Sequence, residues 1–253
     1  MNSFNQQSHI PWWSSFFTGL IVDVQNQMYS VEQTQMEVEF IQRMLSLPEG
    51  ALIADIPCGE GRHSVALAKL GYQMQGVDIS TELIQAATQA ASTAGVVANL
   101  QVGDMKQLPW TSELDGAFCF GNAFAYFDDQ GNRRFLSEVA RSLKPKGRFL
   151  LQTNLIAESI LTKPLARSWY SFGDTLFLHA ASYVPNSATL TSEYTLVQSN
   201  KKEHKTAHYR VYQLRDLLIM LSEVGFQTLE VLGGLKKEPF KLGDPSLYLL
   251  VEK

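Results

Sequence analysis

Hydrophobic and polar positions change their spacing twice along this 253-residue chain. Between residues 51 and 152, short apolar runs alternate with stretches whose apolar residues recur at helical intervals. Strict alternation of apolar and polar residues takes over in 168–212, and helical spacing returns in 213–224 before two last apolar runs. This order predicts an α/β domain that carries an inserted antiparallel β layer.

In the α/β part, strands and helices are expected to alternate strictly, which favours a parallel sheet with right-handed crossovers. A Gly/Pro-rich link joins the two last apolar runs, so these should pair as an antiparallel hairpin. The expected strands are 51–56, 72–77, about 97–102, about 114–120, about 147–152, 226–232 and 246–252; the expected helices are about 62–70, one from Ser80 or Thr81 to Gly95, about 128–143 and 213–224.

The N-terminal region carries two helical patterns within residues 11–47. The second pattern places Met36, Phe40, Met44 and Leu47 on one apolar stripe. The alternating segment 168–212 has turn signals at 185–187 and 200–202, which predict three or four antiparallel strands. We therefore expect a helical cap in 1–50, an α/β domain in 51–155 and 213–253, and a β lid in 156–212.

Composition excludes several classes of protein. Apolar residues make up 45% of the chain, enough for a full core, and the net charge is −4. No basic run exceeds a Lys pair, so a nucleic-acid surface is not expected. Cys58 and Cys119 have neither metal-ligand nor disulfide spacing. No Lys or Arg precedes Arg43 and no apolar run is long enough for a membrane span, which favours a cytoplasmic protein.

The densest chemistry lies where the first two apolar runs end. Asp55 closes the first run, and a turn with Gly59 and Gly61 leads into a helix. These glycines allow the backbone to approach a ligand closely at the helix start. Asp78 closes the second run, where a carboxylate can accept hydrogen bonds from ribose hydroxyls. The pattern predicts a nucleoside-cofactor site.

The details separate two cofactor classes. A dinucleotide site requires a third glycine, but Gly61 is followed by Arg62, His63 and Ser64. A third acid, Asp104, follows the third expected strand and has Met105 beside it. A carboxylate that accepts from an exocyclic amine, together with an apolar neighbour, suits adenine.

At this point the chain resembles the class I S-adenosylmethionine-dependent methyltransferases. The resemblance implies a Rossmann-like seven-stranded sheet, parallel with one reversed strand, to which this chain is expected to add the N-terminal helices and the antiparallel β insert after strand 5. Two departures from the family pattern are Pro57 and Lys146, where many relatives have Gly. The resemblance rests on residues 55–61, 76–80, 103–105, 115–122 and 143–148 in the family's order and spacing.

The resemblance implies S-adenosylmethionine as cofactor, no metal, and a role for each matching position. Gly59 and Gly61 would border the methionine part, Asp78 would hold the ribose, and Asp104 with Met105 would hold adenine. Phe120 would lie beside the sulfonium. The expected cofactor-binding residues are Tyr29, Asp55, Cys58, Gly59, Gly61, Arg62, Asp78, Ile79, Asp104, Met105 and Phe120.

The acceptor is expected to be a small metabolite, methylated on N or O by direct displacement. The segment 121–126 lacks the prolines that base-methylating relatives carry there, which argues against DNA and RNA. The layout resembles small-molecule methyltransferases, including those acting on glycine derivatives and amino sugars. The aromatic pairs Trp12–Trp13 and Phe16–Phe17, with Tyr29, are candidates for walling the same pocket or for capping the core.

Candidate catalytic residues are few. Asn122 and Tyr126 could orient the acceptor, His208 could act as a base, and Arg210 could bind a substrate carboxylate. A solvent-facing or core-packed ring is the simpler reading of each histidine. His63 lies in the first turn of a helix, where the dipole disfavours a positive charge, so a neutral packed ring is favoured over catalysis.

Two other functions stay open from the residues. A nicotinamide-dependent oxidoreductase would need a third glycine or a recognisable catalytic set, and the sequence shows neither. A non-catalytic protein that only binds S-adenosylmethionine would keep the glycines and acids but show no turnover. Either a monomer or a homodimer is compatible with the chain.

Overall fold

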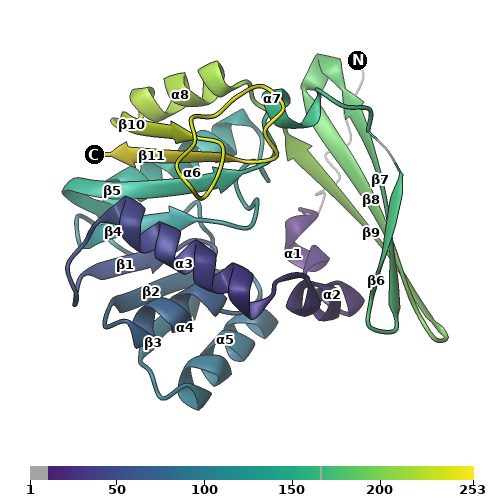
Figure 1. Cartoon of the computed structure of the whole chain (residues 1–253), viewed down its shortest axis with the longest axis horizontal. Helices are drawn as coiled ribbons and strands as arrows, with labels where there is room; N and C mark the ends of the chain where they lie inside the picture. Colours follow the sequence, from purple (N-terminus) through teal and green to yellow (C-terminus); the bar gives the residue numbers. More distant parts are fainter. Residues whose placement is uncertain (1–10, 166) are drawn as a thin grey trace, which may run out of the picture.

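The computed structural model describes residues 11–165 and 167–253, and its larger sheet has seven strands (Figure 1). The strand order is β10-β11-β5-β4-β1-β2-β3, and β11 runs antiparallel to both of its neighbours. The expected fold, parallel with one reversed strand, is confirmed. The strands are β1 (Leu52–Asp55), β2 (Gln73–Asp78), β3 (Ala98–Val102), β4 (Leu114–Cys119), β5 (Leu143–Thr153), β10 (Gln227–Leu232) and β11 (Leu247–Glu252).

Helices cover both faces of this sheet. The N-caps follow the sequence signals, because Ser80 Oγ accepts from Leu83 N at 3.3 Å and Asp128 Oδ1 accepts from Gly131 N at 2.7 Å. Residues of α3 and α4 pack on one face and those of α6 and α8 on the other. The helices are α1 (Trp13–Phe16), α2 (Leu20–Met28), α3 (Val31–Leu45), α4 (Arg62–Lys69), α5 (Thr81–Thr93), α6 (Asp129–Ser142), α7 (Ala157–Ile160) and α8 (Leu214–Glu223).

The insert after β5 is a separate four-stranded antiparallel sheet, seen at the right of Figure 1. Its strands are β6 (Ser168–Phe172), β7 (Thr175–Val184), β8 (Thr189–Gln198) and β9 (Lys201–Arg210), in that order across the sheet. The predicted turns lie at or beside the β7–β8 and β8–β9 connections. Leu190, Ser192 and Leu196 are buried on one face of β8, as the alternation indicates.

The N-terminal helices divide between the two sheets. Four apolar residues of α1 and α2 form a buried cluster with three residues of the insert: Phe16, Leu20, Ile21 and Val24 with Phe177, Leu196 and Ala207. Helix α3 packs on the main sheet instead. Its buried stripe differs in part from the predicted one, because Met36 is 53% exposed and Glu37 is buried in its place. A buried carboxylate such as Glu37 needs a charged or hydrogen-bonding partner, and the partners of Glu37 lie at the functional site.

Two charged side chains of β9 hold the junction between α1 and α2. Leu20 N, at the start of α2, donates to Glu203 Oε2 at 3.0 Å. Lys205 Nζ donates to Ser15 O at 3.1 Å and to Thr18 Oγ1 at 2.9 Å. The carboxylate lies at a helix N-terminus and the ammonium at a helix C-terminus, which is the favourable orientation for both dipoles. Helices α1 and α2 are therefore attached to the insert by charge as well as by burial.

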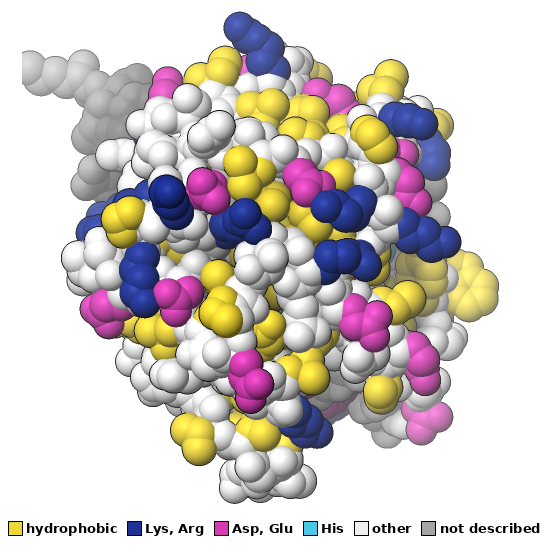
Figure 2. Space-filling view, turned by 60° about the vertical axis from the view of Figure 1, so that its left-hand side comes forward, with side chains coloured by type: hydrophobic (Ala, Val, Ile, Leu, Met, Phe, Trp, Pro, Cys, Tyr) yellow, Lys and Arg dark blue, Asp and Glu magenta, His cyan; other side chains and the backbone are white. Residues whose placement is uncertain are grey.

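The surface of the α/β half is mixed in charge. In Figure 2, Lys and Arg side chains lie interspersed with Asp, Glu and hydrophobic side chains on the face in view. No helix in the described ranges 11–165 and 167–253 is long and apolar enough to cross a membrane. Within these same residues no group of His, Cys, Asp and Glu has the geometry of a metal site.

Replacing Glu203 should weaken the attachment of α2. We expect Glu203→Ala to lower the free energy of unfolding by about 1 kcal/mol, because the first turn of α2 loses its side-chain acceptor and a favourable dipole interaction. The matched control is Glu193→Ala, an exposed glutamate on the neighbouring strand β8. Urea unfolding of both variants measures the difference, and equal losses would contradict the capping role.

Candidate functional site

A cavity of about 630 Å³ opens at the carboxyl ends of β1, β2 and β4. Such edges of parallel sheets are where α/β folds bind ligands. The α/β domain supplies one side of the cavity, and α2 with the residue after it supplies the other. The lining includes Phe17, Gln25, Asn26, Tyr29, Thr34, Asp55, Pro57, Cys58, Gly59, Glu60, Arg62, His63, Lys69, Asp78, Phe120, Gly121 and Tyr126.

The two glycines of the β1–α4 loop serve different purposes. Gly59 has φ +54°, and a Cβ built on it would meet nothing within 4 Å, so this backbone is open to a ligand in the cavity. Gly61 has φ +76°, and its Cβ would lie 3.0 Å from Ala87 Cβ in α5. Gly61 is not part of the cavity lining. Its role is therefore close packing of α4 against α5.

Asp78, at the end of β2, is fixed by the loop opposite it. Its Oδ2 accepts from Gly59 N at 3.0 Å and its Oδ1 from Ser80 N at 2.9 Å. Burial raises the pKa of Asp78, and these backbone donors oppose the rise. The carboxylate is thus held at the cavity wall by the same glycine that exposes its backbone to the cavity.

Asp55, at the end of β1, is the most strongly perturbed acid of the cavity. Its side chain is buried and accepts a hydrogen bond from Ser64 Oγ at 2.8 Å. Burial raises the pKa of Asp55 to about 7, and the Ser64 bond only partly offsets this. Asp55 therefore changes charge near neutral pH.

Arg62 is the cation closest to these acids, but it is already paired. Its Nη1 lies 2.6 Å from Glu37 Oε2, and its guanidinium lies 4.1 Å from the centre of the Tyr29 ring. With Arg62 offset by Glu37, Lys69 is the other basic residue of the lining, against the acids Glu60 and Asp78 and the partly ionised Asp55. The cavity is consequently suited to a cationic ligand.

A second, smaller pocket of about 30 Å³ adjoins the first and shares Phe17, Pro57, Asp78 and Tyr126 with it. Asp104 and Met105 from the loop after β3 lie here with Ile79, against the rings of Trp13 and Phe127. This small apolar slot includes a carboxylate, and the two features together are what a ring with an exocyclic amine requires, while its volume of about 30 Å³ is smaller than an adenine ring. The sequence-predicted adenine residues are thus brought together.

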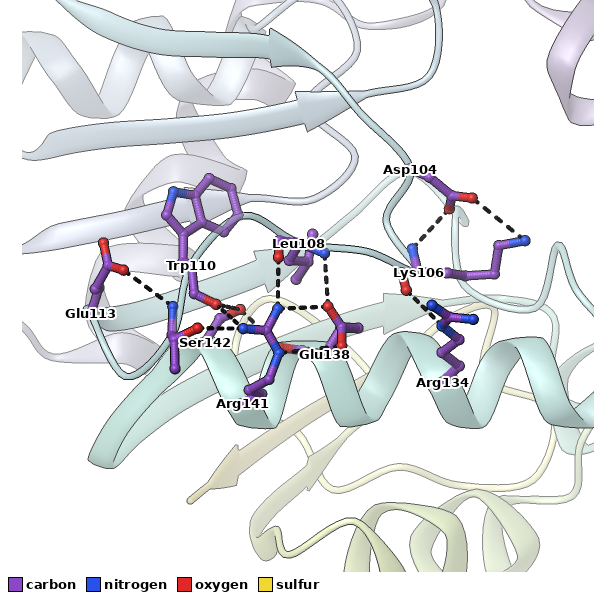
Figure 3. A network of polar contacts seen from close by, with 10 residues as sticks. Asp104, Lys106, Leu108, Trp110, Glu113, Arg134, Glu138, Arg141 and Ser142 are labelled. Carbon is purple, nitrogen blue, oxygen red and sulfur yellow. Dashed lines mark hydrogen bonds and ion pairs between the residues drawn. The ribbon is translucent and has the colours of Figure 1, made fainter.

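Helix α6 holds the loop that carries Asp104 (Figure 3). Arg141 donates to Trp110 O at 2.7 Å and to Leu108 O at 2.6 Å, and Glu138 accepts from both Arg141 and Leu108 N. Arg134 Nε donates to Lys106 O at 3.0 Å. Because the planar guanidinium of Arg141 bonds two carbonyls and a carboxylate at once, it fixes the course of the loop.

The β4–α6 loop borders the other end of the cavity. Gln152 Oε1 accepts from Gly121 N and Asn122 N, at 3.0 and 3.2 Å, and Asn122 Oδ1 accepts from Asn154 N at 2.7 Å. Asn122 is in the left-handed region, with φ +61°. The side chain of Asn122 therefore braces the loop against β5, and this residue does not line the cavity.

Tyr126 connects this loop to the insert. It lines both pockets, and its ring lies 4.9 Å from Trp12 and 5.8 Å from Tyr209 of β9, measured between ring centres. Burial raises the pKa of Tyr126 well above 10, so its phenol is neutral at physiological pH. Among the N-terminal aromatics, Phe17 and Tyr29 also line the main cavity, whereas Phe16 belongs to the core of the insert.

The other two catalytic candidates lie outside the cavity. His208 is exposed on the outer face of β9, where its Nδ1 lies 3.1 Å from Thr191 Oγ1. Arg210 pairs with Asp129, Nε to Oδ1 at 2.7 Å, and stacks over Tyr212. Ala207 and Tyr209 occupy the inward-facing positions of β9. His208 and Arg210 alternate with them along the strand and therefore face away from the site. We assign neither of them a role in chemistry.

Most predicted cofactor positions are brought to the two pockets. Tyr29, Asp55, Cys58, Gly59, Arg62, Asp78 and Phe120 line the main cavity, and Ile79, Asp104 and Met105 line the smaller one. The sequence interpretation missed Glu37. An acidic residue within the apolar stripe of α3 is a signal that could have indicated a buried carboxylate with a partner. It also missed Gln25, Asn26, Thr34 and Lys69, which lie in no motif, and Glu60, which lies inside the 55–61 motif but was assigned no role.

Comparison with known proteins agrees with this geometry. Residues 53–147 match the family described as "Methyltransferase domain". A glycine/sarcosine N-methyltransferase from Aphanothece halophytica is 25% identical over 230 residues, covering 87% of this chain and 83% of that protein. A solved S-adenosylmethionine-dependent methyltransferase from Clostridium acetobutylicum has a TM-score of 0.79 at 15% identity, over 92% of this chain and 96% of that one. An amino pentose methyltransferase from Micromonospora echinaspora, with S-adenosylmethionine bound, has a TM-score of 0.69 at 13% identity, over 94% and 97%.

Asp55 generates a pH-dependence of stability with a defined sign. The pKa of Asp55 is about 7 in the folded protein and near 3.8 in the unfolded chain. Ionisation of Asp55 therefore lowers the stability of the folded state progressively between pH 4 and pH 7, and by a constant amount above pH 7. We expect Asp55→Asn to raise the midpoint of thermal unfolding, least near pH 4 and most above pH 7. Asparagine keeps an acceptor for Ser64.

The control for this pH-dependence is Asp115→Asn. Partial burial raises the pKa of Asp115, but the hydrogen bond from Lys144 outweighs it and holds this pKa below its usual value. The Asp115→Asn protein should therefore be less stable than the wild type at neutral pH, and the difference should shrink as the pH falls. Parallel pH trends in the two variants, measured by differential scanning calorimetry, would contradict the assignment to Asp55.

Proposed function

We propose that this S-adenosylmethionine-dependent methyltransferase of small molecules takes a small amine as its acceptor and methylates it on nitrogen. The observation that carries this proposal is the acidic cavity, which joins the loop at Gly59 to the loop at Gly121 and Tyr126. An amine is largely protonated at neutral pH and is attracted by the same acids as a sulfonium. The similarity to glycine/sarcosine N-methyltransferases from two organisms supports an amino acceptor.

The cavity fits the cofactor. The open backbone at Gly59 and the carboxylate of Asp78 lie together, and the apolar slot with Asp104 and Met105 adjoins them. We propose that Asp78 accepts from the ribose hydroxyls and that Asp104 accepts from the adenine amine. Tyr29, Asp55, Cys58, Arg62 and Phe120 would surround the methionine part, with Ile79 against the base. Gly61 contributes through the packing of α4 and α5 alone.

When bound, S-adenosylmethionine supplies a methyl group on a positively charged sulfur. The residues of this chain align the acceptor nitrogen with that group and exclude water. Phe17 and Tyr126 close the cavity on the side of the insert. Phe17, between α1 and α2 of the attached unit, and Tyr126, in the β4–α6 loop, would thus shield the acceptor together. The brace that Asn122 gives the β4–α6 loop keeps Gly121 and Tyr126 in place.

Methyl transfer to amines tests the proposed acceptor. The protein is incubated with methyl-labelled S-adenosylmethionine and glycine, sarcosine, glucosamine or, as a hydroxyl acceptor, catechol. We expect label transfer to at least one amine and none to catechol, with S-adenosylhomocysteine formed in equal amount. Transfer to catechol alone would overturn the amine proposal, and cofactor binding without transfer to any acceptor would favour a binding protein.

Asp78 should carry a large share of the cofactor affinity. We expect Asp78→Ala to weaken S-adenosylmethionine binding by about 1.5–3 kcal/mol, because a charged acceptor for the ribose is lost. Asp78→Asn keeps one acceptor oxygen and should lose less. Isothermal titration calorimetry measures the affinities, with Asp174→Ala at an exposed turn of the insert as control. Unchanged affinity in a folded Asp78→Ala protein would refute the ribose assignment.

A further inference from the structure

His63 is a buried, ionisable residue of the cavity wall that the proposed function leaves without a task. It lies in the first turn of α4 and is 5% exposed. Its ring meets Phe120 and Phe118 edge to face, at 5.4 and 5.8 Å between centres. Phe120 follows β4 and immediately precedes Gly121, so His63 lies beside the β4–α6 loop that borders the cavity.

One nitrogen of the His63 ring is committed to Glu37. The distance from Nε2 to Glu37 Oε2 is 2.8 Å, and the same carboxylate is 2.6 Å from Arg62 Nη1 and accepts from Gln33 Nε2 at 3.1 Å. Although burial acts against it, these partners lower the pKa of Glu37 to about 2. Glu37 is therefore a carboxylate throughout the physiological range. Nε2 must carry the hydrogen of this bond, since a carboxylate can only accept.

The other nitrogen of the ring, Nδ1, is available. It bonds to no residue in the described ranges. Within these ranges the fully enclosed side-chain polar atoms without a partner are Asn132 Oδ1 and Ser159 Oγ, so Nδ1 is not sealed inside the protein. His63 is among the residues that line the cavity, so the cavity is the accessible space beside this ring.

The surroundings keep the ring uncharged. Burial lowers the pKa of His63, the positive charge of Arg62 lowers it further, and the bond to Glu37 opposes both. The other ionisable groups of the neighbourhood are Asp55 on β1 and Tyr29 after α2, which share the cavity wall, and Tyr248 on β11, which packs on Phe120. A neutral imidazole with a free lone pair is a competent proton acceptor.

Resting on the amine acceptor proposed above, we propose that His63 Nδ1 removes the proton from the acceptor's ammonium group, and that Glu37 is the positioning residue that fixes the ring. A carboxylate that orients a histidine through one ring nitrogen, leaving the other to accept a proton, is a recurring arrangement at sites of nucleophile activation. Here it would activate the substrate nitrogen.

The proposed step accounts for each proton and each electron pair. The ammonium gives one proton to Nδ1, which leaves a lone pair on the acceptor nitrogen. That nitrogen forms its bond to the methyl carbon as the carbon–sulfur bond breaks, and the electron pair of that bond stays on sulfur. The methylated nitrogen carries the positive charge, and the proton on His63 passes to solvent before the next turnover.

A purely structural role of the His63–Glu37 pair predicts different results from a role in proton transfer. Nitrogen NMR of the folded protein distinguishes these two roles. With nitrogen-15 label in histidine, the resonances missing in His63→Gln identify the ring. We expect Nε2 protonated and Nδ1 unprotonated at pH 7, and a mixture of both tautomers in Glu37→Gln. Adding S-adenosylhomocysteine with glycine, sarcosine or glucosamine should shift the Nδ1 resonance. A protonated Nδ1 at pH 7, or no shift with any of the three amines, would overturn the proposal.

Kinetics gives the second test, with the amine that the wild type methylates fastest among these three. At pH 7 we expect kcat of His63→Asn to fall about 10²-fold, and to approach the wild-type value once the pH exceeds the pKa of the acceptor ammonium, because a free amine needs no base. Calorimetry should show nearly unchanged S-adenosylmethionine affinity. The control is His204→Asn, an exposed histidine of β9.

The outcomes separate the two proposals. A loss of kcat in His63→Asn that is equal at every pH would assign His63 a structural role and leave amine methylation intact. Absence of methyl transfer by the wild type to all three amines would instead refute the amine acceptor, and the NMR shifts would still decide whether a ligand reaches Nδ1.

Discussion

The site depends on one short-range interaction, the hydrogen bond from Gly59 N to Asp78 Oδ2. It joins the loop after β1 to the end of β2, and it exists because the two strands are parallel neighbours whose carboxyl ends meet at the same edge. The bond partly compensates the buried carboxylate and fixes a loop whose backbone is open to the cavity. Asp55, which precedes this turn, and Arg62 and His63, which follow it, line the same cavity.

The second half of the architecture is the attachment of α1 and α2 to the insert. Glu203 and Lys205 bond the ends of these helices, and the apolar cluster around Phe16 buries their inner face. The outer face of α2 then supplies the polar rim of the cavity, including Gln25 and Asn26. A segment that is N-terminal in sequence thus works with a β sheet that follows β5.

Sequence patterns predicted the features that depend on neighbouring residues and on regular spacing along the chain. Alternating runs located the strands of both sheets, and acids at strand ends located Asp78 and Asp104. The patterns could not reveal contacts between distant segments. The pairing of Glu37 with His63 joins two helices, and the facing direction of His208 and Arg210 depends on a register that a single residue reverses. The brace formed by Asn122 likewise depends on Asn154, just after β5, which no sequence spacing predicts.

The central claim is that carboxylates at consecutive strand ends hold an adenosyl cofactor beneath the insert. A crystal structure of the protein grown with S-adenosylhomocysteine tests it most directly. The account predicts the ribose hydroxyls within hydrogen-bond distance of Asp78, the adenine in the slot at Asp104 and Met105, and the homocysteine part against Gly59. Density for the ligand at any other edge of the sheet, or on the insert alone, would contradict it.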